Sequence, residues 1–392
     1  MKIGLLGRIL IAIALGVLLG NILTLPWIRI FITFNSIFGQ FLGFIIPLII
    51  VGLVTPAIAD IGKGAGKLLL ITVGIAYADT VIAAILSYTT GSTFFPSLIG
   101  NGSQTLQNVE KSAEILPYFT VNIPAPIDVM SALVLSFIVG LGVAYGSHTV
   151  LRGAINEMKA IVVGVIERVI IPLLPLYIFG IFLNMTFSGD VMRMMTVFAK
   201  IIVVIFALHI FVLMYQYLIA GAIVRKNPFR LLANMFPAYL TALGTSSSAA
   251  TIPVALKQTL KNGVSEGVAG FVIPLCATVH LSGSAMKITA CAFTIALLEG
   301  LPTDFPLFLH FIMVLAIFMV AAPGVPGGAI MASLAPLGSI LGFGENEQAL
   351  MIALYIAMDS FGTACNVTGD GAIALVVDKL NRNKTNVEET AA

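Results

Sequence analysis

Long apolar stretches constrain the fold of this chain more than any other feature. Six of them lie in the first 224 residues, at about 3–25, 37–60, 66–90, 128–150, 160–187 and 194–224. Each is long enough to cross a bilayer, which takes about 20 residues of helix. Charged residues make up only 10% of the chain, whereas a soluble domain carries roughly 25%. We therefore predict an all-α protein that crosses the membrane many times.

The small net charge and the scattered cysteines exclude several classes of function. A formal net charge of +2 gives no electrostatic basis for binding nucleic acid. Cys276, Cys291 and Cys365 lie in apolar context, and such a set predicts neither a disulfide framework nor a zinc site. The first apolar run is too long for a secretion signal, so we expect it to be a retained membrane helix.

After residue 225, Gly, Pro and Ser interrupt the apolar pattern. The interruptions lie at 244–253 and 323–328, and longer spans at about 267–298 and 346–378 lie between and after them. Backbone that turns at membrane depth must be buried against protein or line a wet cavity, because lipid cannot satisfy its N–H and C=O groups. We interpret each interruption as the tip of a re-entrant hairpin, an arrangement typical of transporters. Two kinked helices are the alternative.

Basic residues at the ends of the stretches predict the orientation. With the N-terminus inside, fourteen Lys and Arg residues fall on the cytoplasmic side, and only Arg29, Lys111 and Arg193 fall outside. This bias obeys the positive-inside rule if each hairpin enters and leaves on one face. We therefore expect both termini in the cytoplasm, and the short tails indicate a prokaryotic inner membrane.

The last span carries an unusual set of polar side chains. Asp359 is followed 4, 7 and 11 residues later by Thr363, Asn366 and Asp370, so the four share one narrow helix face. A carboxylate at bilayer depth is costly unless it is paired. Two acids on one face therefore predict a site for a cation or an ammonium group. A polar seam between helices is the alternative.

Several short motifs resemble those of one transporter family. They are 246–253 (SSSAATIP), 324–328 (GVPGG) and 366–370 (NVTGD), and 273–278 (IPLCAT) adds to them. In order, spacing and length, the chain resembles the dicarboxylate/amino acid:cation symporters, the family of glutamate transporters and their bacterial neutral-amino-acid relatives. The resemblance of these motifs implies eight transmembrane helices plus two re-entrant helical hairpins, a homotrimer and an elevator-type movement.

The resemblance also implies a division into a scaffold and a mobile transport domain. The implied segments are scaffold helices 1–2 at 1–65, helix 3 of the transport domain at 66–90, an extracellular loop at 91–127, scaffold helices 4–5 at 128–193, the rest of the transport domain at 194–378 and a cytoplasmic tail at 379–392. An amino acid, a cation and membrane lipids are the implied partners.

Matched residue by residue, the resemblance implies a substrate site. Asp359 would bind the substrate ammonium, Asn366 its α-carboxylate, and Thr363 would line the side-chain pocket. The hairpin tips would contribute Ser247, Ser248, Val325 and Gly327. Gly362 stands where acidic-amino-acid transporters carry an Arg that binds the second carboxylate. Without that cation an acidic side chain would be buried unpaired, so we predict a neutral substrate.

The cation sites depart from the family pattern. Asp370, Asn366 and Thr278 remain as candidate Na+ ligands, but His280 and Ser282 replace the Asn and Asp ligands of helix seven. Imidazole is a poor ligand for Na+, which prefers oxygen donors.

Helix three and a nearby lysine add further candidate coupling residues. Tyr77 and Thr80 match part of a sodium site, Asp79 lies beside them, and Lys287 lies seven residues after His280. Cys276 of the 273–278 motif completes the set.

We hypothesise that protein cations replace bound sodium, with His280 opposite Asp370 and Lys287 opposite Asp79. Coupling to protons would follow, because histidine titrates near neutral pH. The alternatives are a neutral buried histidine, a lysine that extends to the membrane interface, and one Na+ retained at a reduced site.

The sequence thus predicts a secondary symporter of a neutral amino acid, coupled to a Na+ or H+ gradient, with no cofactor unless Na+ is bound. An anion-conducting channel and a non-transporting substrate sensor of the same fold are the alternatives. An enzyme is disfavoured, because no His or acid has a motif relationship to Ser246–Ser248 and Gly-x-Ser-x-Gly is absent.

Overall fold

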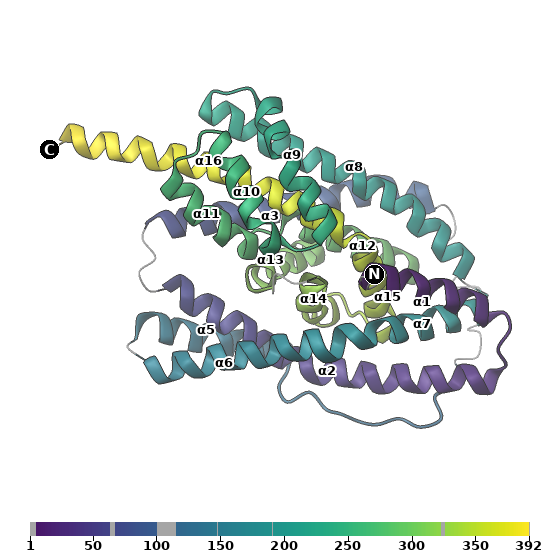
Figure 1. The fold of residues 1–392 in the computed structure, drawn as a ribbon. Helices are drawn as coiled ribbons and strands as arrows, with labels where there is room; N and C mark the ends of the chain where they lie inside the picture. Colours follow the sequence, from purple (N-terminus) through teal and green to yellow (C-terminus); the bar gives the residue numbers. More distant parts are fainter. Residues whose placement is uncertain are drawn as a thin grey trace.

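The computed structural model describes residues 5–62, 67–99, 115–146, 148–189, 191–322 and 326–391. Within these ranges the protein is all-helical, as predicted (Figure 1). The elements are α1 (Leu5–Gly20), α2 (Leu25–Gly62), α3 (Lys67–Ile99), α5 (Val129–Tyr145), α6 (Thr149–Val165), the π-helical turn η1 (Ile166–Ile170), α7 (Ile171–Phe187), α8 (Val191–Val224), α9 (Pro228–Thr245), α10 (Ser248–Lys261), α11 (Glu266–Val279), α12 (Ser282–Glu299), α13 (Phe305–Ala321), α14 (Gly328–Ser339), α15 (Glu345–Ala357) and α16 (Asp359–Ala391).

Among the described residues, five helical stretches are long and apolar enough to span a bilayer. They are Leu25–Ala59, Leu68–Leu98, Thr149–Phe187, Met195–Val224 and Glu266–Glu299. A sixth forms if α15 and α16, which meet at an angle of 64°, count as one broken span. The protein is therefore a multi-pass membrane protein.

Several element ends differ from those expected. α2 begins at Leu25 rather than near residue 37, and Pro26 at its start suits a first helical turn, where no backbone N–H partner is needed. α6, η1 and α7 form one continuous helix over residues 149–187, which includes residues 151–159 before the expected span. The exposed polar side chains of 151–159 are compatible with a helix that extends out of the bilayer. Residues 91–99 of the expected loop continue α3, and 100–114 lie outside the described residues.

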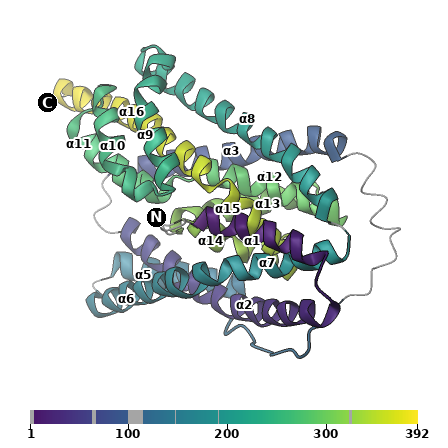
Figure 2. The ribbon, with the colours of Figure 1, turned by 45° about the vertical axis from the view of Figure 1, so that its right-hand side comes forward.

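Two groups of helices make most of their contacts internally. α2 packs on α5, α6 and α7, and α1 packs on α7, whereas α3 packs on α12 and α16 packs on α8, α9 and α11. In Figures 1 and 2, α2, α5, α6 and α7 form the lower layer. In the same views, α3, α8, α9 and α16 form the upper layer, with α14 and α15 between the two.

The helical backbone is interrupted inside the protein at four places. The α9–α10 hairpin turns at Ser246, whose left-handed φ of 51° is uncommon for a residue with a side chain. In the α13–α14 hairpin, the turn ends at Gly327, directly before α14, where φ is 77°. The other two places are breaks between α11 and α12 at His280 and between α15 and α16 at Met358. Both of these spans were expected to be continuous, so the breaks are findings of the structure.

Candidate functional site

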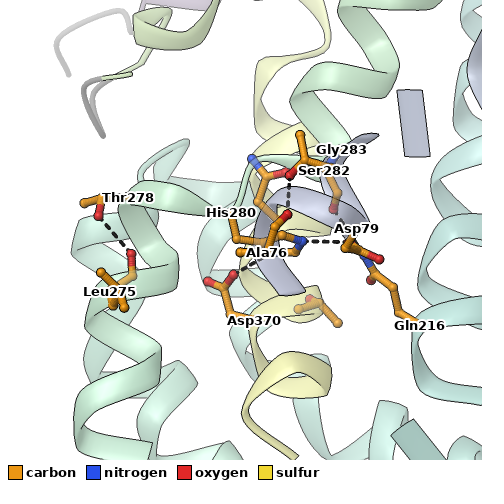
Figure 3. Close-up of polar contacts among 12 residues, drawn as sticks. Ala76, Asp79, Gln216, Leu275, Thr278, His280, Ser282, Gly283 and Asp370 are labelled. Atoms are coloured by element: carbon orange, nitrogen blue, oxygen red, sulfur yellow. Dashed lines mark hydrogen bonds and ion pairs between the residues drawn. The ribbon is translucent and has the colours of Figure 1, made fainter. Parts of the chain in front are cut away.

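His280 lies at the break between α11 and α12 and is completely buried. Its Nδ1 lies 2.8 Å from Asp370 Oδ1 of α16, and its Nε2 lies 2.8 Å from Asp79 Oδ2 of α3. Figure 3 shows the ring between the two carboxylates. We call Asp79, His280 and Asp370 the triad.

Asp79 accepts two further hydrogen bonds from α8. Tyr215 donates to Oδ1 and Gln216 Nε2 donates to Oδ2, each at 2.7 Å, and Gln216 Nε2 also lies 3.1 Å from Ser282 Oγ. Tyr215 and Gln216 were not among the residues expected from the sequence. A signal was present, because a Gln inside so apolar a helix as α8 is unusual at membrane depth.

The two short contacts of His280 fix the number of protons in the triad. A neutral imidazole has one N–H and can donate to only one carboxylate. Both contacts are therefore hydrogen bonds only if the triad holds a second proton. Asp79 already accepts hydrogen bonds from Tyr215 and Gln216, which favours its ionised form. An imidazolium between two carboxylates satisfies both contacts, as does a neutral ring beside one protonated carboxyl group.

The imidazole ring of His280 occupies the space between the two carboxylates. Its two ring nitrogens each lie beside one oxygen of a different carboxylate. Gly369 of α16 makes that approach possible, because a Cβ there would lie 2.9 Å from His280 Cε1 and 2.7 Å from Gln216 Oε1. Within the described residues, no group of three or more His, Cys, Asp or Glu side chains is arranged to hold a metal ion.

The pairing of Lys287 with Asp79 was wrong. Lys287 Nζ lies 3.7 Å from Asp359 Oδ1, while Asp79 is engaged by His280, Tyr215 and Gln216. The reason is the break before α12. The expected pairing assumed one straight helix from His280 to Lys287, but α12 begins anew at Ser282 and directs Lys287 toward the α15–α16 break.

A small cavity of about 30 Å³ lies beside Asp359. It is lined by Ser246, Ser248, Ala277, Thr278, Leu281, Ser284, Ala322, Ala329, Tyr355, Asp359, Thr363 and Asn366. Both hairpins and both broken spans thus contribute to one pocket. Its size suits about one water molecule, so an amino acid requires the surrounding elements to move apart.

The substrate residues expected from the sequence lie at or near this pocket. Ser248 lines it, and Ser247 caps α10 through a 3.3 Å bond from Ala250 N–H. Gly327 N–H of the second hairpin donates to Asp359 Oδ2 at 2.9 Å. Val325 lies outside the described residues. Ser246, Ser284 and Tyr355 were not among the expected substrate residues.

Asn366 and Thr363 are engaged within the protein in this geometry. Asn366 Oδ1 accepts from the backbone N–H groups of Gly283 and Ser284 at 2.8 and 3.3 Å, and thereby caps the start of α12. Asn366 Nδ2 donates to Ser284 Oγ at 3.1 Å. Thr363 donates to the backbone carbonyl of Asp359 at 2.9 Å. Asn366 thus connects the break between α11 and α12 to α16, the helix that carries Asp359 and Asp370.

The other candidate coupling residues do not converge on the triad. Tyr77 donates to the carbonyl of Met313 at 3.1 Å, and Thr80 donates to Ala76 of its own helix at 2.8 Å. Thr278 donates to Leu275 and points away from His280 in Figure 3. The side chain of Cys276 is buried, and its carbonyl accepts from His280 N–H. The structure therefore does not assemble these residues around Asp370 as ligands of one ion.

The chain is similar to known proteins over nearly its whole length. The sodium:dicarboxylate symporter family matches residues 5–380. The chain is 29% identical to the serine/threonine transporter SstT of Acinetobacter baumannii (strain AYE) over 98% of both chains. The corresponding protein of Acinetobacter baylyi is 25% identical over 97% of this chain and 98% of its own. Human excitatory amino acid transporter 2 is 32% identical over 43% of this chain and 29% of its own.

Proposed function

The chain belongs to the sodium:dicarboxylate symporter family, and we propose that it is a secondary symporter that couples uptake of a small neutral amino acid to protons instead of sodium. The observation that carries the proposal is the position of His280, 2.8 Å from both Asp79 and Asp370. An imidazolium there supplies the positive charge that buried carboxylates need.

A neutral substrate is supported by the charges around the pocket. Gly362 leaves no guanidinium at that position, and the nearby Lys287 is already balanced by Asp359. A second carboxylate on the substrate would therefore add a buried negative charge without a partner, which is strongly unfavourable. The names of the Acinetobacter relatives, which describe serine/threonine transporters, agree with this class.

The helix contacts support an elevator mechanism. α1, α2, α5, α6 and α7 would form the scaffold and the centre of a homotrimer, and α3 with α8–α16 would form the transport domain. Substrate binding between the two hairpins would close the domain before it moves. We place the protein in a prokaryotic inner membrane with both termini in the cytoplasm.

Proton coupling follows from the charge of the triad. With His280 protonated, the triad has one net negative charge, and without that proton a neutral ring would face two carboxylates. Losing the proton is favourable only where water reaches the triad. Transport would thus carry a proton inward with the amino acid. The neighbouring groups, Tyr215 and Gln216 of α8 and Cys276 of α11, would remain uncharged while the triad gains and loses its proton.

Uptake into proteoliposomes tests this proposal. We expect an inward proton gradient to drive accumulation of a neutral amino acid such as serine, because each cycle delivers the triad proton. A protonophore should abolish accumulation, and replacing all Na+ by choline should leave it unchanged. Accumulation that requires Na+ and does not depend on the pH gradient would contradict proton coupling. The absence of uptake of any amino acid under every gradient would contradict the transport function itself.

A further inference from the structure

Lys287 is a completely buried lysine that the proton-coupling step does not use. Its Nζ donates to the carbonyls of Tyr355 and Met358 at 3.3 and 3.2 Å, and lies 3.5 Å from the centre of the Tyr355 ring. These carbonyls end α15, where a cation is favoured by the helix dipole. The ammonium group is thus held by its own protein at the break between α15 and α16.

The nearest anion to this ammonium is Asp359, the acid of the substrate pocket. Nζ lies 3.7 Å from Asp359 Oδ1, which is close enough for charge compensation but longer than a hydrogen bond. Gly362 provides the space, since a Cβ there would lie 2.9 Å from Nζ. Asp359 Oδ1 can therefore accept a hydrogen bond from another donor, while Lys287 already balances the charge of the carboxylate.

The second hairpin closes on the same carboxylate. Gly327 N–H donates to Asp359 Oδ2 at 2.9 Å, and the adjoining cavity of about 30 Å³ is too small for an amino acid. The geometry is therefore that of a pocket closed around a carboxylate whose counter-charge comes from Lys287.

We propose that Lys287 is a built-in counter-cation of Asp359 that allows the transport domain to cross the membrane without substrate. This inference rests on the proposed transport function. Lys287 balances the charge of Asp359, and a zwitterionic amino acid brings no net charge, so this pair keeps the pocket neutral both with and without substrate. Without Lys287, closing the pocket with no amino acid inside would bury Asp359 unpaired, which is strongly unfavourable.

Net uptake and exchange separate this role from a structural one. Net uptake requires the transport domain to return without substrate and without the triad proton, whereas exchange in preloaded liposomes moves it only with both bound. We expect Lys287→Met to lower net uptake at least about tenfold, equivalent to a barrier increase of about 1.4 kcal/mol. The rate of exchange of labelled for unlabelled amino acid should stay within about threefold of the native rate, a much smaller change than the tenfold loss of net uptake.

Two further variants keep the test decisive. Lys287→Gln keeps hydrogen-bond donors for the carbonyls of Tyr355 and Met358 but removes the charge, so it should show the same selective loss of net uptake. Lys257→Met removes a lysine from the exposed side of α10 and should change neither rate.

Equal rates of net uptake by the native protein and the Lys287→Met and Lys287→Gln variants would overturn the inference. An equal loss of net uptake and exchange in both variants would also overturn it, because Lys287 would then support the fold or the loaded pocket. Failure of the native protein to transport in either assay would instead contradict the proposed function.

Discussion

Replacing His280 with alanine is expected to reduce amino-acid uptake at least about 100-fold and to lower the free energy of unfolding by about 3–5 kcal/mol. The substitution removes the side chain that lies 2.8 Å from both Asp79 and Asp370. The two buried carboxylates then repel each other without a cation between them. Uptake into proteoliposomes and thermal unfolding in detergent measure the two effects.

His310→Ala is the matched control for this variant. His310 lies on α13 with an exposed side chain, so its loss should leave both uptake and stability nearly unchanged. His280→Asn sharpens the test, because it places an amide oxygen beside two carboxylates, a donor set that suits Na+. We expect this variant to be inactive without Na+ and partly restored by it. Native-like uptake of His280→Ala in choline buffer would show that the imidazolium has no role.

Asp359→Asn is expected to weaken binding of the amino acid at least about 100-fold, or about 2.7 kcal/mol. The substrate ammonium would lose its anion, and Lys287 would lose the carboxylate 3.7 Å from its Nζ. Truncating one partner of a buried charge pair costs about 2–5 kcal/mol, which is consistent with that loss. Isothermal titration calorimetry on the purified protein measures the change.

Asp378→Asn is the control, because Asp378 lies on the same helix and accepts from Ser265 at 2.5 Å, away from the pocket. Its affinity for the amino acid should match that of the native protein. If Asp359→Asn bound the amino acid as tightly as Asp378→Asn, Asp359 would not be the ammonium site and the substrate assignment would fail.

Much of the architecture could be predicted because burial in a bilayer leaves a strong local signal. Apolar stretches predicted helices at all six positions, although α1 and α5 are shorter than a full span. The Ser-rich and Gly-Pro-rich segments predicted interruptions where α9–α10 and α13–α14 turn. The spacing of Asp359 and Asp370 predicted one polar helix face, since helical spacing is a local property. In the structure Asp359 lines the pocket, whereas Asp370 belongs to the triad.

The partners of the buried charges could not be predicted in the same way. Each break depends on a distant residue: Asn366 caps the start of α12, and Lys287 binds the end of α15. Periodicity contains no information on such contacts, so the spans were expected to be straight and Lys287 was assigned to the wrong acid. Asp79 instead meets His280 and Gln216, which come from two other helices.

The protonation state of His280 tests the central claim most directly. ¹⁵N NMR of the histidine-labelled protein at neutral pH, with the His280 signals identified among the four histidines by their loss in His280→Asn, reports whether each ring nitrogen carries a proton. We predict a doubly protonated imidazolium whose signals do not change when Na+ is added. A neutral ring protonated on one nitrogen, or signals that shift on Na+ binding, would contradict the claim that histidine replaces the sodium ion.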